Sequence, residues 1–174
     1  ESSKQRIDID MNTPVLDFKF QHDLLKDEML SAFTSVYESN WFILGKHLVN
    51  FETEYAVFNQ VAYTVGVSNG LDALYLALKA LEIGAGDEVI VPSNTYIATV
   101  LAVSYTGATP ILVEPDPKTY NINPDLISEK ITSKTKAILA VHLYGQLAEM
   151  KAICSNMAYR SKVATFEGRH DSLR

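Results

Sequence analysis

Cysteine is almost absent from this sequence, whose 174 residues contain only one, Cys154. A single cysteine excludes an internal disulfide, so the fold does not depend on covalent cross-links, and a reducing, cytoplasmic setting is expected. Because Cys154 falls in a helical pattern, it is predicted to be a small core residue and not a nucleophile.

Long apolar runs and clusters of basic residues are also missing. No stretch reaches the roughly 20 apolar residues of a membrane-spanning helix, and residues 1–10 lack the apolar core of a signal peptide. The net charge of −6 argues against a nucleic-acid-binding surface, which would need clustered Lys and Arg. Neither a membrane nor a nucleic acid is an expected partner, and no metal site is predicted.

The apolar residues that are present, 47% of the chain, are enough to build a core. From residue 63 onward, short apolar segments alternate with amphipathic ones. This pattern predicts strands at 63–67, 88–91, 109–113 and 137–141, and helices at 71–82, at 95–105, in a short segment from Pro124, and from Ala148. Apolar strands that alternate with helices indicate an α/β fold, a mostly parallel sheet with helices on both faces.

Two further helices are predicted before this region, at 22–38 and from Leu48 to Phe58, because apolar residues recur there at helical spacing. The segment between them is an apolar loop rich in aromatics. One interpretation of this loop is a buried tether between the two helices, and the other is a wall of a binding site.

The joint between the strand predicted at 63–67 and the next helix contains only small or polar residues, Ser68, Asn69 and Gly70. A helix that begins there leaves its first N–H groups without partners, and these groups, together with the helix dipole, can hold a phosphate. Gly70 has no side chain where the anion would approach. The alternative is that Ser68 or Asn69 is a plain N-cap, and Asp72 would compete with a bound anion.

Three short segments follow predicted strands, at 68–71, 93–96 and 142–144. Ligands of parallel sheets bind beyond the carboxyl ends of the strands, and these segments are expected at that edge. Their convergence predicts a ligand-binding protein.

Several segments resemble a known family. GVSNGLDALYLALKALEIGAGDEVIVPSNTYIAT, GATPILVEPDPKTYNINPDLI and TKAILAVHLYGQLAEM are similar to the sugar aminotransferases of the DegT/DnrJ/StrS type, which are pyridoxal-phosphate enzymes of aminotransferase fold type I. LDFKFQ and SNWFILGKHLVNFETEYA fit the same family, so the resemblance covers roughly residues 14–153. PSNTYIAT and VHLYGQ are most similar to enzymes that aminate 3-keto or 4-keto deoxysugars carried on dTDP.

The resemblance implies a domain organisation and a set of site residues. Residues 1–45 would form an N-terminal arm and helix, 46–153 an incomplete three-layer cofactor-binding domain, and 154–174 a divergent tail. Residues that would contact the cofactor, pyridoxal 5'-phosphate, are Asn69, Gly70 and Leu71 at its phosphate and Tyr96 stacked on its ring, unless Tyr96 only packs in the core. Residues that would line the substrate site are Asn40, Trp41, Phe42, Ile43, Tyr144 and His142, the last of which is otherwise a structural histidine.

The family also uses two residues that this chain does not match, an Asp that binds the pyridine nitrogen and a Lys that forms the Schiff base. After about Ile153 the sequence departs from the family pattern. Glu167 and Asp171 are nearby acids, and Lys151 and Lys162 precede the expected position. None of these four is assigned a catalytic role, so no catalytic residue is assigned in this chain.

The leading expectation is the N-terminal portion of an enzyme that moves an amino group, from glutamate, to a keto-sugar nucleotide. The intact parent is expected to be a homodimer, and the chain alone is expected to be inactive and to aggregate. The alternatives are a non-catalytic fragment that acts only by subunit association, and a pyridoxal-phosphate sugar dehydratase of the same family.

Overall fold

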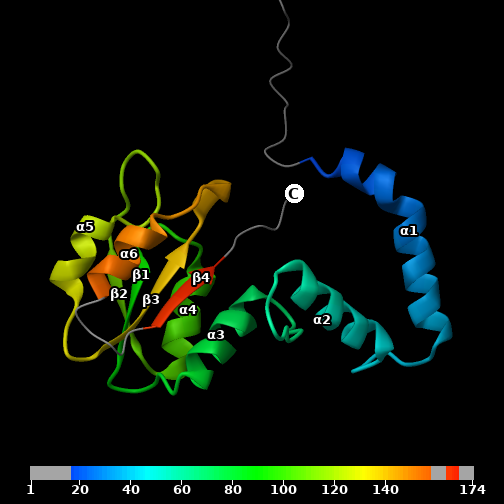
Figure 1. Cartoon of the computed structure of the whole chain (residues 1–174), viewed down its shortest axis with the longest axis horizontal. Helices are drawn as coiled ribbons and strands as arrows, with labels where there is room; N and C mark the ends of the chain where they lie inside the picture. Colours follow the sequence, from blue (N-terminus) through cyan, green and yellow to red (C-terminus); the bar gives the residue numbers. More distant parts are fainter. Residues whose placement is uncertain (1–16, 158–163, 169–174) are drawn as a thin grey trace, which may run out of the picture. The chain divides into compact units, whose positions relative to one another are not determined.

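The structure is a computed structural model that describes residues 17–157 and 164–168. These residues fall into two compact units, which divide between Gly66 and Val67 (Figure 1). No helix within the described ranges is long and apolar enough to cross a membrane.

The first unit consists of two helices, α1 (Lys19–Glu38) and α2 (Lys46–Phe58) (Figure 1). Both predicted N-terminal helices are confirmed to within a few residues. Helix α1 has no buried residue, and α2 buries only Ala56. The apolar positions that predicted these helices therefore do not form a core among the described residues of this unit.

The strand predicted at 63–67 is wrong. This segment has no regular secondary structure and pairs with no described strand, and Tyr63 and Val65 are 88% and 76% exposed. Its backbone is instead attached to α2, because the N–H of Gly66 donates to Glu52 Oε1 at 2.7 Å. An apolar run becomes a strand only beside another strand, and none of the described strands pairs with this one.

The second unit contains a parallel sheet in the order β2-β1-β3-β4 (Figure 1). Its strands are β1 (Glu88–Pro92), β2 (Thr109–Val113), β3 (Thr135–Val141) and β4 (Ala164–Gly168). The first three confirm the strands predicted at 88–91, 109–113 and 137–141. Strand β4 lies inside the segment interpreted as a divergent tail, and pairs with β3 from Ala137↔Ala164 to Val141↔Gly168.

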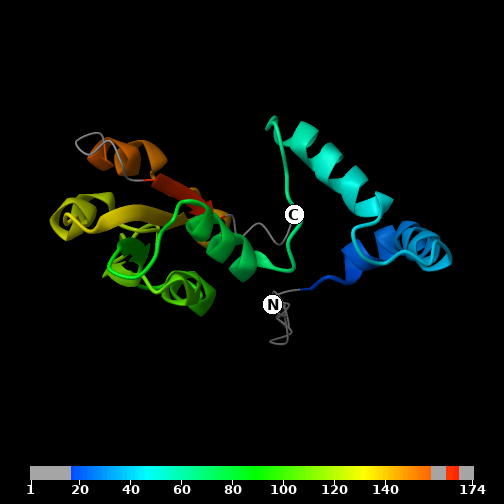
Figure 2. The ribbon, with the colours of Figure 1, turned by 90° about the horizontal axis from the view of Figure 1, so that it is seen from below.

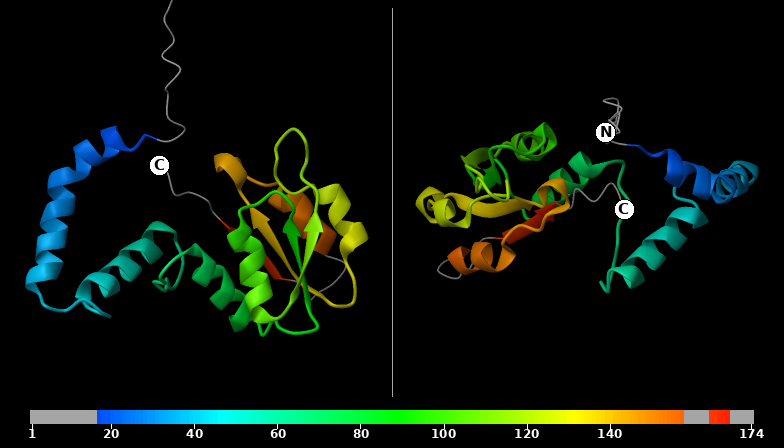
Figure 3. Two further views of the ribbon diagram at one scale, coloured as in Figure 1. Left: turned by 180° about the vertical axis from the view of Figure 1, so that it is seen from behind. Right: turned by 90° about the horizontal axis from the view of Figure 1, so that it is seen from above.

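Helices cover both faces of this sheet, as the α/β interpretation required (Figures 2 and 3). Helices α3 (Gly70–Ala80) and α4 (Ile97–Thr106) cover one face, and α5 (Pro124–Ile127) and α6 (Met150–Met157) the other. Successive residues of the central strands point to opposite faces of the sheet, so they pack alternately against the α3–α4 layer and the α5–α6 layer. Leu139 packs with the α3–α4 layer, whereas its neighbours Ile138 and Ala140 pack with the α5–α6 layer.

One core prediction in α6 is wrong. Cys154 is exposed, and its neighbour Ile153 is the buried residue of that turn, with 0% exposure. Helical spacing fixes which residues share a face, but it does not fix which of two adjacent small or apolar residues faces the sheet.

The strand order creates a switch point between β1 and β3. The chain leaves β1 toward β2 on one side, and leaves β3 toward β4 on the other. In open parallel sheets this arrangement opens a crevice outside the carboxyl ends of the two diverging strands, where ligands bind. Here those ends are Pro92 and Val141.

Candidate functional site

The loops that follow β1, β2 and β3 are joined to one another at the carboxyl edge of the sheet. Asn94, after β1, donates from Nδ2 to the carbonyl of Tyr120, at 2.9 Å, in the loop after β2. Asn121, the next residue of that loop, accepts from the N–H of Leu143, at 2.9 Å, in the turn after β3. The three loops therefore form one surface that flanks the switch point.

The beginning of α3 lies toward the same edge. The C-terminal end of α3 leads through 81–87 into the start of β1, which is the amino edge, and α3 packs along the sheet beside α4 (Figure 1). Its N-terminus therefore points toward the carboxyl edge. Two of the three predicted segments, 93–96 and 142–144, are joined through the loop after β2, and 68–71 lies at the same end of the unit.

Asn69 is the N-cap of α3, as one of the two interpretations proposed. Its Oδ1 accepts from the N–H of Asp72 at 3.0 Å. The capping leaves the first two N–H groups of the helix, those of Gly70 and Leu71, without a protein partner among the described residues. A Cβ at Gly70 would meet nothing within 4 Å, so the approach to these donors is open.

The carboxylate of Asp72 is the feature that opposes an anion here. It accepts one hydrogen bond from Ser68 Oγ and another from Asn69 Nδ2 at 3.2 Å. These bonds hold the negative charge on the side of the 68–69 loop. Two free N–H groups, a helix dipole and open space beside Gly70 fit a phosphate, provided that Asp72 stays bound to that loop.

Tyr96 lies at the N-cap position of α4, directly after the loop that leaves β1, and is 64% exposed. The interpretation that it packs in the core is therefore wrong. The first residue of this helix to be buried is Thr99, whose hydroxyl bonds that of Thr95 at 2.9 Å. Its exposed ring lies at this edge of the sheet, and an aromatic face suits a flat ligand.

The turn after β3 contains one buried and one exposed site residue. His142 is 1% exposed, and its Nδ1 accepts from the N–H of Ala148 at 3.0 Å, so it fixes the shape of the turn. A substrate contact for His142 stays a prediction. Tyr144 is 85% exposed and has a left-handed backbone, with φ 56°.

Asn121 is a polar residue of this edge that sequence reasoning missed. It is 3% exposed and makes two bonds to the 142–148 turn, accepting from the N–H of Leu143 and donating from Nδ2 to the carbonyl of Gln146 at 3.0 Å. Its neighbour Tyr120 also has a left-handed backbone, with φ 59°, and its ring lies edge-on to that of Tyr144. No sequence pattern distinguishes a buried Asn in a loop from an exposed one, so the role of Asn121 could not be predicted.

The remaining candidate residues, Asn40, Trp41, Phe42 and Ile43, lie in the first unit. Trp41, Phe42 and Ile43 are 65%, 64% and 77% exposed, so the interpretation as a buried tether is wrong. Their loop is folded on itself, with Trp41 Nε1 donating to the carbonyl of Ile43 at 2.6 Å. Asn40 has a left-handed backbone and donates to the carbonyl of Glu38 at 3.2 Å.

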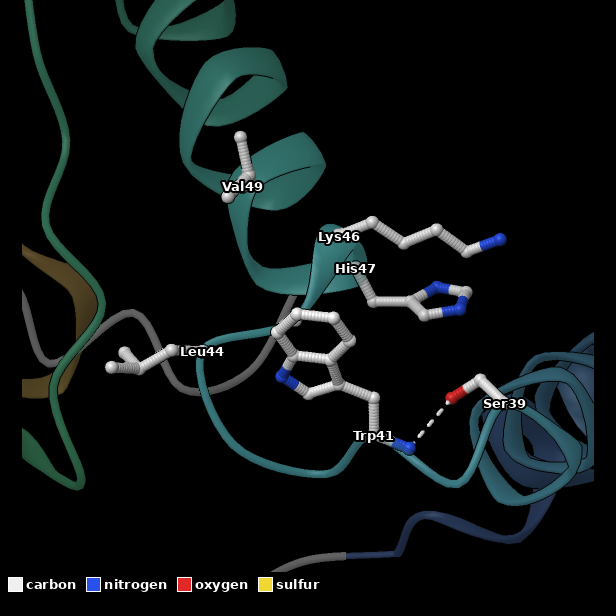
Figure 4. A pocket seen from close by; sticks show the side chains of 7 residues that line it. Ser39, Trp41, Leu44, Lys46, His47 and Val49 are labelled. Atoms are coloured by element: carbon white, nitrogen blue, oxygen red, sulfur yellow. Dashed lines mark hydrogen bonds between the residues drawn. The ribbon is translucent and has the colours of Figure 1, made fainter.

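A hollow of about 370 Å³ opens beside this loop (Figure 4). Of the four candidate residues, only Trp41 lines it. The full lining is Ser39, Trp41, Leu44, Gly45, Lys46, His47 and Val49. His47 Nε2 is buried and has no hydrogen-bond partner within the described part of the chain.

Residues 23–168 match the model of the DegT/DnrJ/EryC1/StrS aminotransferase family. A similar protein is the dTDP-3-amino-3,6-dideoxy-alpha-D-galactopyranose transaminase of Aneurinibacillus thermoaerophilus, 54% identical over 140 residues. The alignment covers 80% of this chain and 39% of that enzyme. The chain therefore spans well under half the length of this relative.

Solved structures show the same fold. The crystal structure of DesV from S. venezuelae superposes with a TM-score of 0.84 at 44% identity, covering 89% of this chain and 42% of DesV. The structure of NtdA from Bacillus subtilis with bound cofactor PMP gives a TM-score of 0.82 at 36% identity, covering 92% of this chain and 38% of NtdA.

Proposed function

Because the chain belongs to the DegT/DnrJ/EryC1/StrS aminotransferase family, we propose that it supplies part of a pyridoxal-phosphate enzyme that aminates a keto-deoxysugar carried on a nucleotide. The amino donor in this proposal is glutamate. The substrate class is supported by the similar transaminase from A. thermoaerophilus, whose name specifies a dTDP-linked amino sugar.

The observation that carries the proposal is the pair of open N–H donors at Gly70 and Leu71, at the same end of the unit as the exposed ring of Tyr96. The donors bind and orient the cofactor phosphate, and Tyr96 stacks on its ring. When bound, pyridoxal phosphate supplies the electron sink and carries the amino group. Support for this cofactor comes from the PMP form of NtdA.

The substrate roles follow as part of the same proposal. Tyr144 contacts the sugar nucleotide from the turn after β3, with His142 beside it. Asn40, Trp41, Phe42 and Ile43, in the exposed loop of the first unit, are also assigned to the substrate in this proposal. The intact enzyme is a homodimer in this proposal. The large exposed apolar side chains of α1, among them Phe20, Leu24 and Phe33, support an assembly that covers them.

The phosphate seat is tested by Gly70→Val. The variant is expected to bind pyridoxal phosphate about ten-fold or more weakly, because the side chain would fill the space through which the anion reaches the Gly70 and Leu71 donors. Folding should be unaffected, because Gly70 does not have a left-handed backbone and its Cβ position is free of contacts. Absorbance titration of the cofactor measures the first effect, and thermal unfolding the second.

Gly84→Val is a matched control, because Gly84 also lacks a left-handed backbone and lies between α3 and β1, at the opposite edge. It should leave cofactor affinity unchanged. If Gly70→Val binds the cofactor as tightly as the parent chain and Gly84→Val do, the phosphate is held elsewhere.

Borohydride reduction tests whether this chain also anchors the cofactor covalently. No lysine of the chain matches the family's Schiff-base position, so binding is expected to be reversible, with all cofactor lost on dialysis after reduction. Mass spectrometry of the reduced protein measures this. A stable adduct on Lys151 or Lys162 would contradict the expectation and would assign that lysine a catalytic role.

A further inference from the structure

The exposed rings of Tyr120 and Tyr144 form a pair at the carboxyl edge of the sheet, called the tyrosine pair below. We propose that the tyrosine pair stacks the base of the nucleotide substrate. This inference rests on the proposed function, because it assumes that a nucleotide-linked substrate reaches this edge. It adds Tyr120 as a binding residue and assigns Tyr144 to the base, not to the sugar.

The geometry of the two rings leaves a surface for a flat ligand. Their centroids are 6.5 Å apart and their planes are inclined by 77°, so the edge of one ring meets a face of the other. An edge-to-face pair uses only one face of the ring that receives the edge, so the pair itself does not cover the other face. The exposed fractions of 55% for Tyr120 and 85% for Tyr144 show that both rings reach solvent.

Both tyrosines adopt an unusual backbone conformation. Both have left-handed backbones, with φ 59° and 56°, a conformation that is unfavourable for a residue with a side chain. Such strain persists only where the surroundings impose it, and it concentrates at ligand sites. Here buried Asn121 holds the turn of Tyr144, and Tyr120 is held by two bonds, one that its carbonyl accepts from Asn94 Nδ2 and one that its N–H donates to the carbonyl of Asp116.

The choice of the base follows from position. Tyr96 lies at the start of α4, after β1, whereas Tyr144 lies in the turn after β3, so the tyrosine pair is separate from the residue assigned to the cofactor ring. In a nucleotide-linked sugar, the reacting carbon must lie against the cofactor ring, and the base is the far end of the molecule. Every base also has an aromatic face, so an open tyrosine face can bind it without reading its hydrogen-bonding groups.

The test compares dTDP, which carries a base, with inorganic pyrophosphate, which carries the charge alone. Affinities of the purified chain are measured by calorimetry for the parent, Tyr144→Ala, Tyr120→Ala and Tyr144→Phe. The matched control is Tyr105→Ala, because Tyr105 is 60% exposed but lies at the C-terminal end of α4, on the opposite edge. Circular dichroism establishes that each variant is folded.

Tyr144→Ala is expected to weaken dTDP binding about five-fold or more, the lower limit for loss of one stacked base. Tyr120→Ala should weaken it in the same direction. Tyr144→Phe, which keeps the ring, and Tyr105→Ala should match the parent. Pyrophosphate affinity should be the same in all five proteins, because no charge is changed.

Three outcomes would overturn the inference: no binding of dTDP by the parent chain, equal dTDP affinity in Tyr144→Ala and the parent, or equal losses for dTDP and pyrophosphate. Failure of the proposed function is seen separately, in the cofactor titration. A chain that binds dTDP through the tyrosine pair but does not bind pyridoxal phosphate would retain this inference and lose the cofactor assignment.

Discussion

Leu139→Ala is expected to lower the free energy of unfolding of the second unit by about 2–5 kcal/mol. Leu139 lies in β3, between β1 and β4, and is 0% exposed. Its side chain packs in the cluster that joins the sheet to α3 and α4, where Leu78 and Val103 are also fully buried. Truncation removes apolar contacts and leaves a cavity, because the rigid strands on both sides cannot close over it. Urea unfolding followed by circular dichroism measures the loss.

Leu112→Ala is the matched control for this substitution. It makes the same chemical change in a strand, but Leu112 lies in the edge strand β2 and is 50% exposed. Its cost should stay near or below about 1 kcal/mol, because much of the side chain is already in water. Equal costs at the two positions would show that the α3–α4 layer does not pack on β3 as described.

Asn121→Leu is expected to cost at least about 2 kcal/mol and to loosen the 142–148 turn. The substitution keeps the side chain's approximate size, but it removes the acceptor of the Leu143 N–H and the donor to the Gln146 carbonyl. Both hydrogen bonds are partly buried, and the loss of each is expected to cost about 1 kcal/mol. Thermal unfolding reports the global loss, and hydrogen exchange of the Leu143 amide reports the local one.

Asn94→Leu serves as the comparison for the Asn121 variant. Asn94 is exposed and makes one bond, to the carbonyl of Tyr120, so water can replace the lost donor. The substitution should lower the free energy of unfolding by about 1 kcal/mol, and the Leu143 amide should stay protected from hydrogen exchange. If the Leu143 amide exchanges as slowly in the Asn121→Leu variant as in the parent chain, then Asn121 does not hold the turn.

Sequence periodicity predicted the elements of the second unit well, because there the apolar pattern and the burial agree. Strand β2 has the predicted bounds, and the short helix predicted from Pro124 is α5, which begins at that residue. The same reasoning failed at 63–67, where an apolar run has no neighbouring strand. A local apolar pattern indicates that a segment can be buried. A strand also needs a neighbouring strand to pair with, and the local sequence does not show whether one is present.

The site was predictable in outline and not in detail. The rule that ligands bind at the carboxyl edge placed Tyr96 and the 142–144 turn correctly on one surface. The exposure of Trp41 and Tyr96 contradicts the alternatives that placed them in a core. The sequence left those alternatives open because an aromatic residue is common both in cores and in binding sites. Asn121 was missed for the opposite reason, since its burial depends on a turn that lies 22 residues further along the chain.

The order β2-β1-β3-β4 also constrains the sequence of events during synthesis. The ribosome delivers β1 and then β2, which can pair at once because they are neighbours in the sheet. Strand β3 must then cross to the free side of β1, and only after it docks does the Leu143 amide reach Asn121. Until that moment the amide of Asn121 remains hydrated. The surface that holds the tyrosine pair is thus assembled late, and a nascent chain paused before residue 143 would carry β1 and β2 without that surface.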